Sequence, residues 1–266
     1  MSDHFTDKVV WITGASSGIG EALAYTMSAH GAKIILTSRR VDELERVKNA
    51  CRHPDEVKIF PLDLSDIPSL DGQAEKAVAL FGRVDIMVHN AGISQRSLVI
   101  ETELEVHRKI MELDYFSYVE LTKALLPHFI TQKAGHFVVV SSVMGKIGTP
   151  MRSAYAAAKH ALHGFFDCLR AEVSPAGIKV TILTPGYINT NISLHSLTKS
   201  PYGKAKSEDI SNGLSAEKAA EQILRAIKRG AFEAYIGRLS GERVALWLNR
   251  FAPGVMARIA PKLIPK

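Results

Sequence analysis

Six short apolar runs of strand length recur along the chain, and longer segments with helical spacing separate them. The runs are KVVWITG, KIILTS, VKIFPLDL, VDIMVHNAG, GHFVVVSS and KVTILTPG, beginning at residues 8, 33, 57, 84, 135 and 179. Strands this continuously apolar suit a parallel sheet that is buried on both faces. Alternation of strand and helix with right-handed crossovers then predicts a doubly wound α/β fold of about seven strands flanked by helices.

Length and composition indicate one domain over residues 1–266. A chain of 266 residues, with 46% hydrophobic and 23% charged residues, can bury the core of one large α/β domain. Two segments stand apart within it. Residues 191–212 are expected to form a variable loop beside a substrate, and residues 238–266 form an extension that mixes basic and apolar residues.

Several classes of protein are disfavoured by the composition. Cys51 and Cys168 lie far apart in no metal-like spacing, which predicts neither a disulfide framework nor a metal site. The net charge of +6 is spread along the chain, so no nucleic-acid partner is expected. No apolar run resembles a signal peptide or a membrane span, and we expect a cytoplasmic protein.

Small and polar residues follow all six strands, where ligands bind in open sheets of this kind. Gly14, Gly18 and Gly20 lie between the first strand and a helical segment, so the backbone could approach a pyrophosphate at a helix N-terminus. The spacing differs from the common dinucleotide fingerprint. Alone, such a turn is as consistent with a simple tight turn as with a nucleotide site.

Tyr155 and Lys159 are four residues apart and therefore share one face of a predicted helix. A free phenol has a pKa of about 10, and a nearby ammonium favours the phenolate, which would let the tyrosine give or take a proton. The alanines at 154 and 156–158 leave room for a ligand. By itself this spacing also occurs as an ordinary surface pair.

Taken together, the motifs resemble the classical short-chain dehydrogenase/reductase family from about residue 8 to residue 190. The matching residues, in the order and spacing of the family, are Thr13 to Gly20, Asn90 to Gly92, Ser142, Tyr155, Lys159 and Pro185 to Gly186. The resemblance implies a Rossmann-like domain, a nicotinamide cofactor and hydride transfer. Residues 145–172 resemble the branch of dehydrogenase/reductase member 7-like and 11β-hydroxysteroid-dehydrogenase-like enzymes.

The resemblance also assigns roles. Tyr155 would be the general acid–base, Lys159 its cationic partner and Ser142 a donor to the substrate oxygen. The residues expected to bind the cofactor are Gly14, Ser16, Ser17, Gly18, Ile19, Gly20, Arg39, Arg40, Asp63, Leu64, Asn90, Ala91, Gly92, Tyr155, Lys159, Pro185, Gly186, Ile188 and Thr190. His89 stands where relatives often have asparagine and is interpreted as structural.

The end of the second strand bears on the choice of cofactor. A carboxylate there would bind the ribose 2′-hydroxyl of NAD, whereas this chain has Ser38 followed by Arg39 and Arg40. Guanidinium groups bind phosphate through paired hydrogen bonds, which favours NADP, with NAD as an alternative. The arginines could instead be a solvated start of a helix, and Ser17 lacks the basic character that many NADP-preferring relatives have in the glycine loop.

Asp114 is the main departure from the family pattern, which has asparagine at this position. Its carboxylate near Lys159 would stabilise the ammonium while screening part of its effect on Tyr155. We therefore include Asp114 among the candidate catalytic residues.

The substrate is expected to be a small hydrophobic alcohol or carbonyl compound, because the predicted rim is mostly apolar. That rim consists of Ile93, Ser94, Met144, Met151 and Tyr187. The family resemblance suggests a homodimer or homotetramer. The extension is expected to pack over the pocket or a subunit interface rather than on a membrane, because its prolines interrupt a long helix. An alternative function is a dinucleotide-sensing regulatory protein that keeps the fold without turnover.

Overall fold

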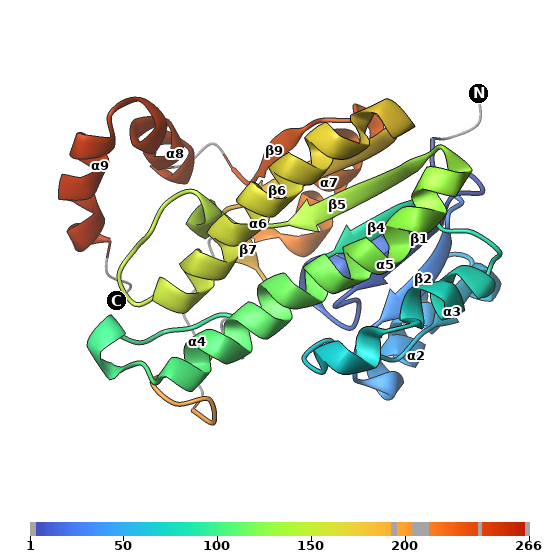
Figure 1. The fold of residues 1–266 in the computed structure, drawn as a ribbon, viewed down its shortest axis with the longest axis horizontal. Coiled ribbons are helices and arrows are strands. Elements are labelled where there is room, and N and C mark those ends of the chain that lie inside the picture. Colours follow the sequence, from blue (N-terminus) through green and yellow to red (C-terminus); the bar gives the residue numbers. More distant parts are fainter. Residues whose placement is uncertain (1–3, 193–195, 204–212, 239–240, 264–266) are drawn as a thin grey trace.

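The structure is a computed structural model, and it describes residues 4–192, 196–203, 213–238 and 241–263. Its centre is a seven-stranded sheet of order β3-β2-β1-β4-β5-β6-β9 in which every pairing is parallel (Figure 1). The strands are β1 (Val9–Thr13), β2 (Lys33–Thr37), β3 (Val57–Ile59), β4 (Ile86–His89), β5 (Gly135–Val140), β6 (Ile178–Pro185) and β9 (Glu233–Ile236). The prediction of a doubly wound parallel sheet is confirmed.

Helices cover both faces of the sheet, as the apolar character of the strands requires. The first face carries α1 (Gly18–Ala29), α2 (Val41–Ala50) and α7 (Ala216–Lys228). The second carries α3 (Gln73–Ala79), α5 (Ser117–Gln132) and the long α6 (Ser153–Val173), with α4 (Leu104–Met111) leading into α5. Two hydrophobic cores therefore form, one on each side of the sheet.

Shorter elements connect this framework. The 3₁₀ turns are η1 (Pro54–Glu56), η2 (Ile67–Leu70), η3 (Val99–Glu101), η5 (Val143–Gly145), η6 (Ser174–Ala176) and η8 (Ala260–Lys262). A π-helical segment, η4 (Glu112–Phe116), joins α4 to α5. After β6 the chain forms a small parallel pair of strands, β7 (Ile188–Asn189) and β8 (Leu214–Ser215).

The C-terminal extension folds into two helices, α8 (Gly241–Phe251) and α9 (Pro253–Ile259). Pro253 begins α9, where a missing backbone N–H costs nothing, so the proline divides the segment without ending its helical character. Met256 packs with Val143 and Ile147 beside the carboxyl end of β5. Within the described part of the chain, no helix combines the length and the apolar character that crossing a bilayer would need.

Candidate active site

The turn after β1 requires glycine. Gly14 has φ +63°, and a Cβ atom on it would lie 2.7 Å from the Cα atom of Ala91. A Cβ on Gly20 would lie 2.4 Å from the carbonyl oxygen of Gly14. The Asn90 side chain closes the arrangement, because its amide donates to the carbonyl oxygens of Thr13 and Gly14 at 3.0 and 3.2 Å. The ends of β1 and β4 are thereby fixed against the start of α1.

A groove of about 370 Å³ runs along these strand ends. Among the predicted cofactor residues, those that line it are Gly14, Ser16, Ser17, Gly18, Ile19, Arg39, Arg40, Asp63, Leu64, Asn90, Ala91, Gly92, Tyr155, Lys159, Pro185, Gly186, Ile188 and Thr190. Gly20 is absent from the lining and acts in packing, as its close approach to Gly14 indicates. The structure therefore brings these predicted cofactor residues together on one continuous surface.

One end of the groove is basic. The Arg40 guanidinium donates to Ser16 Oγ at 3.1 Å, and Arg39 lies 4.0 Å from the Asp63 carboxylate. Burial raises the pKa of Asp63, but hydrogen bonds from Ser65 and the charge of Arg39 outweigh it and hold that pKa below its ordinary value. Arg46 donates to the carbonyl oxygen of Ser16 at 3.4 Å, but its charge is balanced by Glu21 at 2.7 Å and Glu43 at 2.8 Å.

Ser142, Tyr155 and Lys159 lie together at the other end of the groove. Lys159 is only 3% exposed, and its Nζ atom lies 5.6 Å from the centre of the Tyr155 ring. Ser142 follows β5, and its Oγ atom accepts the backbone N–H of Met144 at 3.1 Å. The helical spacing of Tyr155 and Lys159 therefore does bring phenol and ammonium to one site.

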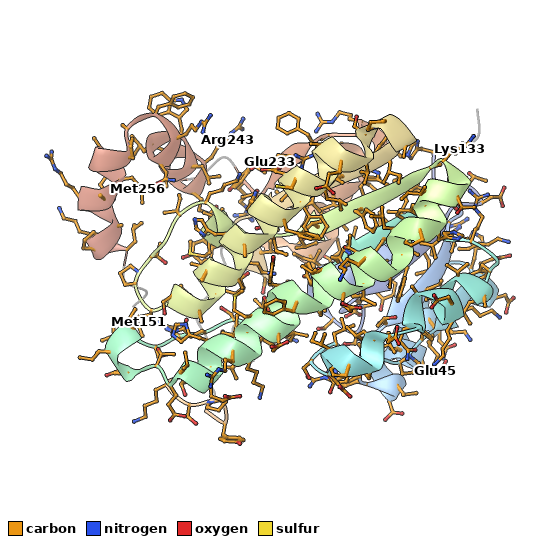
Figure 2. The ribbon with its side chains drawn as sticks, in the orientation of Figure 1. Glu45, Lys133, Met151, Glu233, Arg243 and Met256 are labelled. Carbon is orange, nitrogen blue, oxygen red and sulfur yellow. The ribbon has the colours of Figure 1, made fainter. Side chains whose placement is uncertain are left out.

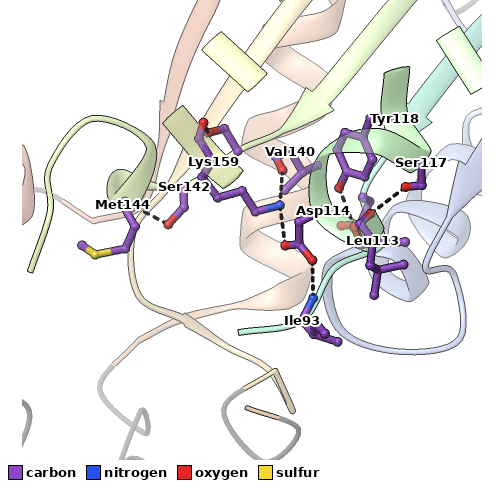
Figure 3. A network of polar contacts seen from close by, with 12 residues as sticks. Ile93, Leu113, Asp114, Ser117, Tyr118, Val140, Ser142, Met144 and Lys159 are labelled. Atoms are coloured by element: carbon purple, nitrogen blue, oxygen red, sulfur yellow. Dashed lines mark hydrogen bonds and ion pairs between the residues drawn. The ribbon is translucent and has the colours of Figure 1, made fainter. Parts of the chain in front are cut away.

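Asp114 lies behind the groove and is fully buried. Figure 3 shows its Oδ1 atom accepting the N–H of Ile93 at 2.9 Å, while Oδ2 forms an ion pair with Lys159 Nζ at 3.2 Å. Lys159 also donates to the carbonyl oxygen of Val140 at 3.3 Å. Gly92 makes room for the carboxylate, because a Cβ atom there would lie 2.7 Å from Oδ2.

Opposing effects act on the pKa values of this pair. Burial raises the pKa of Asp114. The ammonium of Lys159 and the N–H of Ile93 act to lower that pKa, but the effect of burial is larger. Burial would lower the pKa of Lys159. The negative charge that Tyr118, Asp114 and Tyr155 carry when ionised outweighs this effect and raises that pKa. Lys159 therefore keeps its proton at neutral pH.

Tyr118 is a member of this cluster that the sequence analysis missed. Its ring centre lies 5.3 Å from Lys159 Nζ, and its hydroxyl donates to the carbonyl oxygen of Ala91 at 2.6 Å. Its position four residues after Asp114 could have indicated that both share a helix face. His89 stacks on Tyr118 at 4.9 Å and contacts Thr122 Oγ1 at 2.9 Å, which agrees with its interpretation as structural.

A second cavity of about 230 Å³ adjoins the groove, and Ser142 and Tyr155 line both. Of the predicted rim residues, Ser94, Met144 and Tyr187 line this cavity, Ile93 lines the groove, and Met151 is in neither lining. From the predicted variable loop, Ile192 lines both cavities, whereas residues 193–195 and 204–212 lie outside the described residues.

The extension also reaches this cavity. Gly241, Glu242, Ala245 and Leu263 line it, so the structure places the described part of the extension over the pocket, as expected from the sequence. Glu242 is held by the N–H of Tyr187 at 2.8 Å and the hydroxyl of Tyr235 at 2.7 Å.

Arg152, another lining residue that the sequence analysis missed, donates to Ser94 Oγ at 2.7 Å. In the described ranges no cluster of three or more metal-ligating side chains occurs.

Sequence comparisons identify the family to which the chain belongs. The family model described as short chain dehydrogenase matches residues 8–200. A dehydrogenase/reductase SDR family protein 7-like from Anopheles gambiae is 44% identical over 273 aligned residues, covering 99% of this chain and 85% of the relative. A dehydrogenase/reductase SDR family member 7B from Xenopus tropicalis is 41% identical, covering 95% of this chain and 84% of the relative.

Solved structures of short-chain dehydrogenases have the same fold. A short-chain dehydrogenase from Streptomyces avermitilis superimposes with a TM-score of 0.80 at 32% identity, covering 96% of each chain. A short chain dehydrogenase/reductase from Burkholderia phymatum, solved in complex with NAD, superimposes with a TM-score of 0.83 at 22% identity over 96% of each chain, which shows the common fold.

Proposed function

Because this chain belongs to the short-chain dehydrogenase/reductase family, an oxidoreductase family that uses a nicotinamide cofactor, we propose that it is an NADP(H)-dependent enzyme interconverting a hydrophobic alcohol and its carbonyl compound. The observation that carries the proposal is the position of Tyr155 and Ser142 at the junction of the two cavities. A substrate carbon in the second cavity would then meet a cofactor in the groove.

The residues present fit a nicotinamide dinucleotide. The glycine turn exposes backbone that no side chain covers. A Cβ atom on Gly18 would occupy part of this space, because it would lie 3.1 Å from Thr190 Cγ2. When bound, the nicotinamide supplies or accepts the hydride. Arg39 and Arg40, with Ser38 in place of a carboxylate, support NADP over NAD because they favour a 2′-phosphate.

Tyr155 would move the proton. In reduction its hydroxyl protonates the carbonyl oxygen, and in oxidation its phenolate removes the alcohol proton. The buried Lys159 ammonium favours the phenolate, and with Asp114 behind it the ammonium is fixed in place. Ser142 accepts the N–H of Met144, which leaves its own hydroxyl hydrogen available for the substrate oxygen.

The test is a screen of hydrophobic ketones, aldehydes and alcohols with NADP(H) and NAD(H), followed by absorbance of the reduced nicotinamide. We expect turnover with higher kcat/KM for NADP(H). Tyr155→Phe should lose at least about 100-fold in kcat while still binding the cofactor. Equal rates for wild type and Tyr155→Phe would refute the assignment of the proton donor.

The competing function is dinucleotide sensing without turnover. One observation favours it: the Asp114 carboxylate partly neutralises the cation beside Tyr155. Tight binding of NADP(H) by fluorescence, together with no turnover of any compound in the screen, would support sensing over catalysis.

We also propose a homodimer or homotetramer that works in the cytoplasm. The family generally forms oligomers, and this supports the assembly. Light scattering on the purified full chain tests the assembly, and fractionation of cells that express it tests the location.

A further inference from the structure

The outer side of the C-terminal helices is apolar and exposed. On α8, Val244, Trp247 and Phe251 are 58%, 60% and 68% exposed, and the two rings lie 5.3 Å apart. Positions i, i+3 and i+7 share one helix face, so the three side chains form one stripe. On α9, Val255 and Ile259 are also exposed. We call these five residues the outer face.

The inner side of the same helices is already occupied. Ala245 and Leu246 pack in the cluster around Met256, and Asn249 donates to the carbonyl oxygen of Lys146 at 2.8 Å. The exposed rings therefore cannot turn inward without breaking these contacts. Figure 2 shows side chains of α8 and α9 projecting away from the sheet.

Charge distinguishes the outer face from an ordinary apolar patch. From residue 241 to 263 the basic residues are Arg243, Arg250, Arg258 and Lys262, and Glu242 is the only acidic residue. The Glu242 carboxylate is held inward by Tyr187 and Tyr235. A helix surface with tryptophan and phenylalanine beside arginines matches the interface of an anionic lipid bilayer.

A second exposed apolar segment lies at the same end of the molecule. Val99, Ile100 and Leu104 are exposed, in and just after η3. Figure 1 shows that the green segment before α4 and the red helices α8 and α9 lie at one end of the long axis. A bilayer that meets this end of the molecule would face both segments.

From these observations we propose that the outer face docks the protein peripherally on anionic membranes, which differs from the sequence-based expectation because Pro253 begins a second helix instead of ending the helical extension. Self-association through the same face is disfavoured, because a two-fold contact would bring the arginines of both copies together. Docking does not depend on the proposed reaction, since it uses no residue that touches cofactor or proton.

The test is flotation of the full-length protein with vesicles of phosphatidylcholine alone and of phosphatidylcholine mixed with phosphatidylserine. We expect strong binding to the mixed vesicles that weakens with salt, and weak binding to phosphatidylcholine alone. Trp247→Ser with Phe251→Ser should reduce partitioning at least about tenfold. Arg243→Gln with Arg250→Gln should reduce it about fivefold for each arginine.

Matched controls remove an aromatic ring and two arginines at other places on the surface. Phe232→Ser removes an exposed ring just before β9, and Arg225→Gln with Arg229→Gln removes two arginines at the end of α7. Circular dichroism and cofactor binding verify that each variant folds. Equal binding of the Trp247 variant and wild type would overturn the proposal. The proposal would also be overturned if the wild type failed to bind vesicles and formed a dimer, seen by light scattering, that the Trp247 variant does not form.

Discussion

At the residue scale, the unusual feature of the site is the Asp114 carboxylate. It is fully buried, 3.2 Å from the Lys159 ammonium, and hydrogen bonded to Ile93. A buried ion pair is costly to break from one side, because the remaining charge loses its partner. The family pattern described above has asparagine there, so this chain carries one more negative charge behind the proposed acid–base.

We expect Asp114→Asn to keep or improve turnover. Asparagine can still accept the N–H of Ile93, and loss of the negative charge strengthens the effect of Lys159 on Tyr155. The rate of alcohol oxidation at a fixed pH should therefore equal or exceed that of the wild type. The measurement is kcat against pH for both proteins.

The control is Asp114→Leu, which leaves the buried ammonium with the carbonyl oxygen of Val140 but without its carboxylate partner and should lower stability. Loss of activity to background in a folded Asp114→Asn protein would mean that the carboxylate has a role of its own.

At the element scale, the site depends on how η4 meets the turn after β4. The π-helical segment carries Asp114 into the interior, and Ser117 Oγ donates to the carbonyl oxygen of Leu113 at 2.6 Å beside it. Segments of this kind occur often at functional sites because the wider turn redirects side chains. Gly92 fits against the carboxylate only because it has no side chain.

We expect Gly92→Ala to lower the free energy of unfolding by about 1–3 kcal/mol, because the new methyl group would meet Asp114 Oδ2. In the Asp114→Ala background the same change should cost less than about 0.5 kcal/mol, since the clash is gone. Urea unfolding of the wild type, the two single variants and the double variant gives the cost of Gly92→Ala in each background. Equal costs in the two backgrounds would show that the two residues do not meet.

At the scale of the whole molecule, three histidines are buried in the framework among the described residues. Burial lowers the pKa of His89 to about 3, of His136 to about 3 and of His163 to about 4. Their Nε2 atoms contact hydroxyls of Thr122, Thr181 and Ser141. All three are neutral in the folded chain, whereas in the unfolded chain they take up protons below about pH 6.5.

Stability should therefore be fully present above about pH 6.5 and fall as the pH drops toward the folded values. The unfolded state binds more protons in this window, so each histidine contributes a slope of up to about 1.4 kcal/mol per pH unit. We expect His136→Gln, which can still bond Thr181, to reduce the slope between pH 6 and 5 by about 1 kcal/mol per pH unit. Urea unfolding at a series of pH values measures it.

The matched control is His160→Gln, which makes the same substitution at an exposed position on α6. An unchanged slope in the His136 variant would show that this histidine already takes up its proton in the folded protein.

Local spacing was enough to predict the sheet, the glycine turn and the shared helix face of Tyr155 and Lys159. These features follow from strand and helix periodicity and from backbone conformations that only glycine adopts readily, which are properties of neighbouring residues. The tertiary structure decided which distant side chains share an interior. It placed Asp114, Gly92 and Tyr118 around Lys159, and it turned one face of α8 toward the pocket and the other outward. Burial depends on long-range packing, so the sequence pattern alone could not assign these partners.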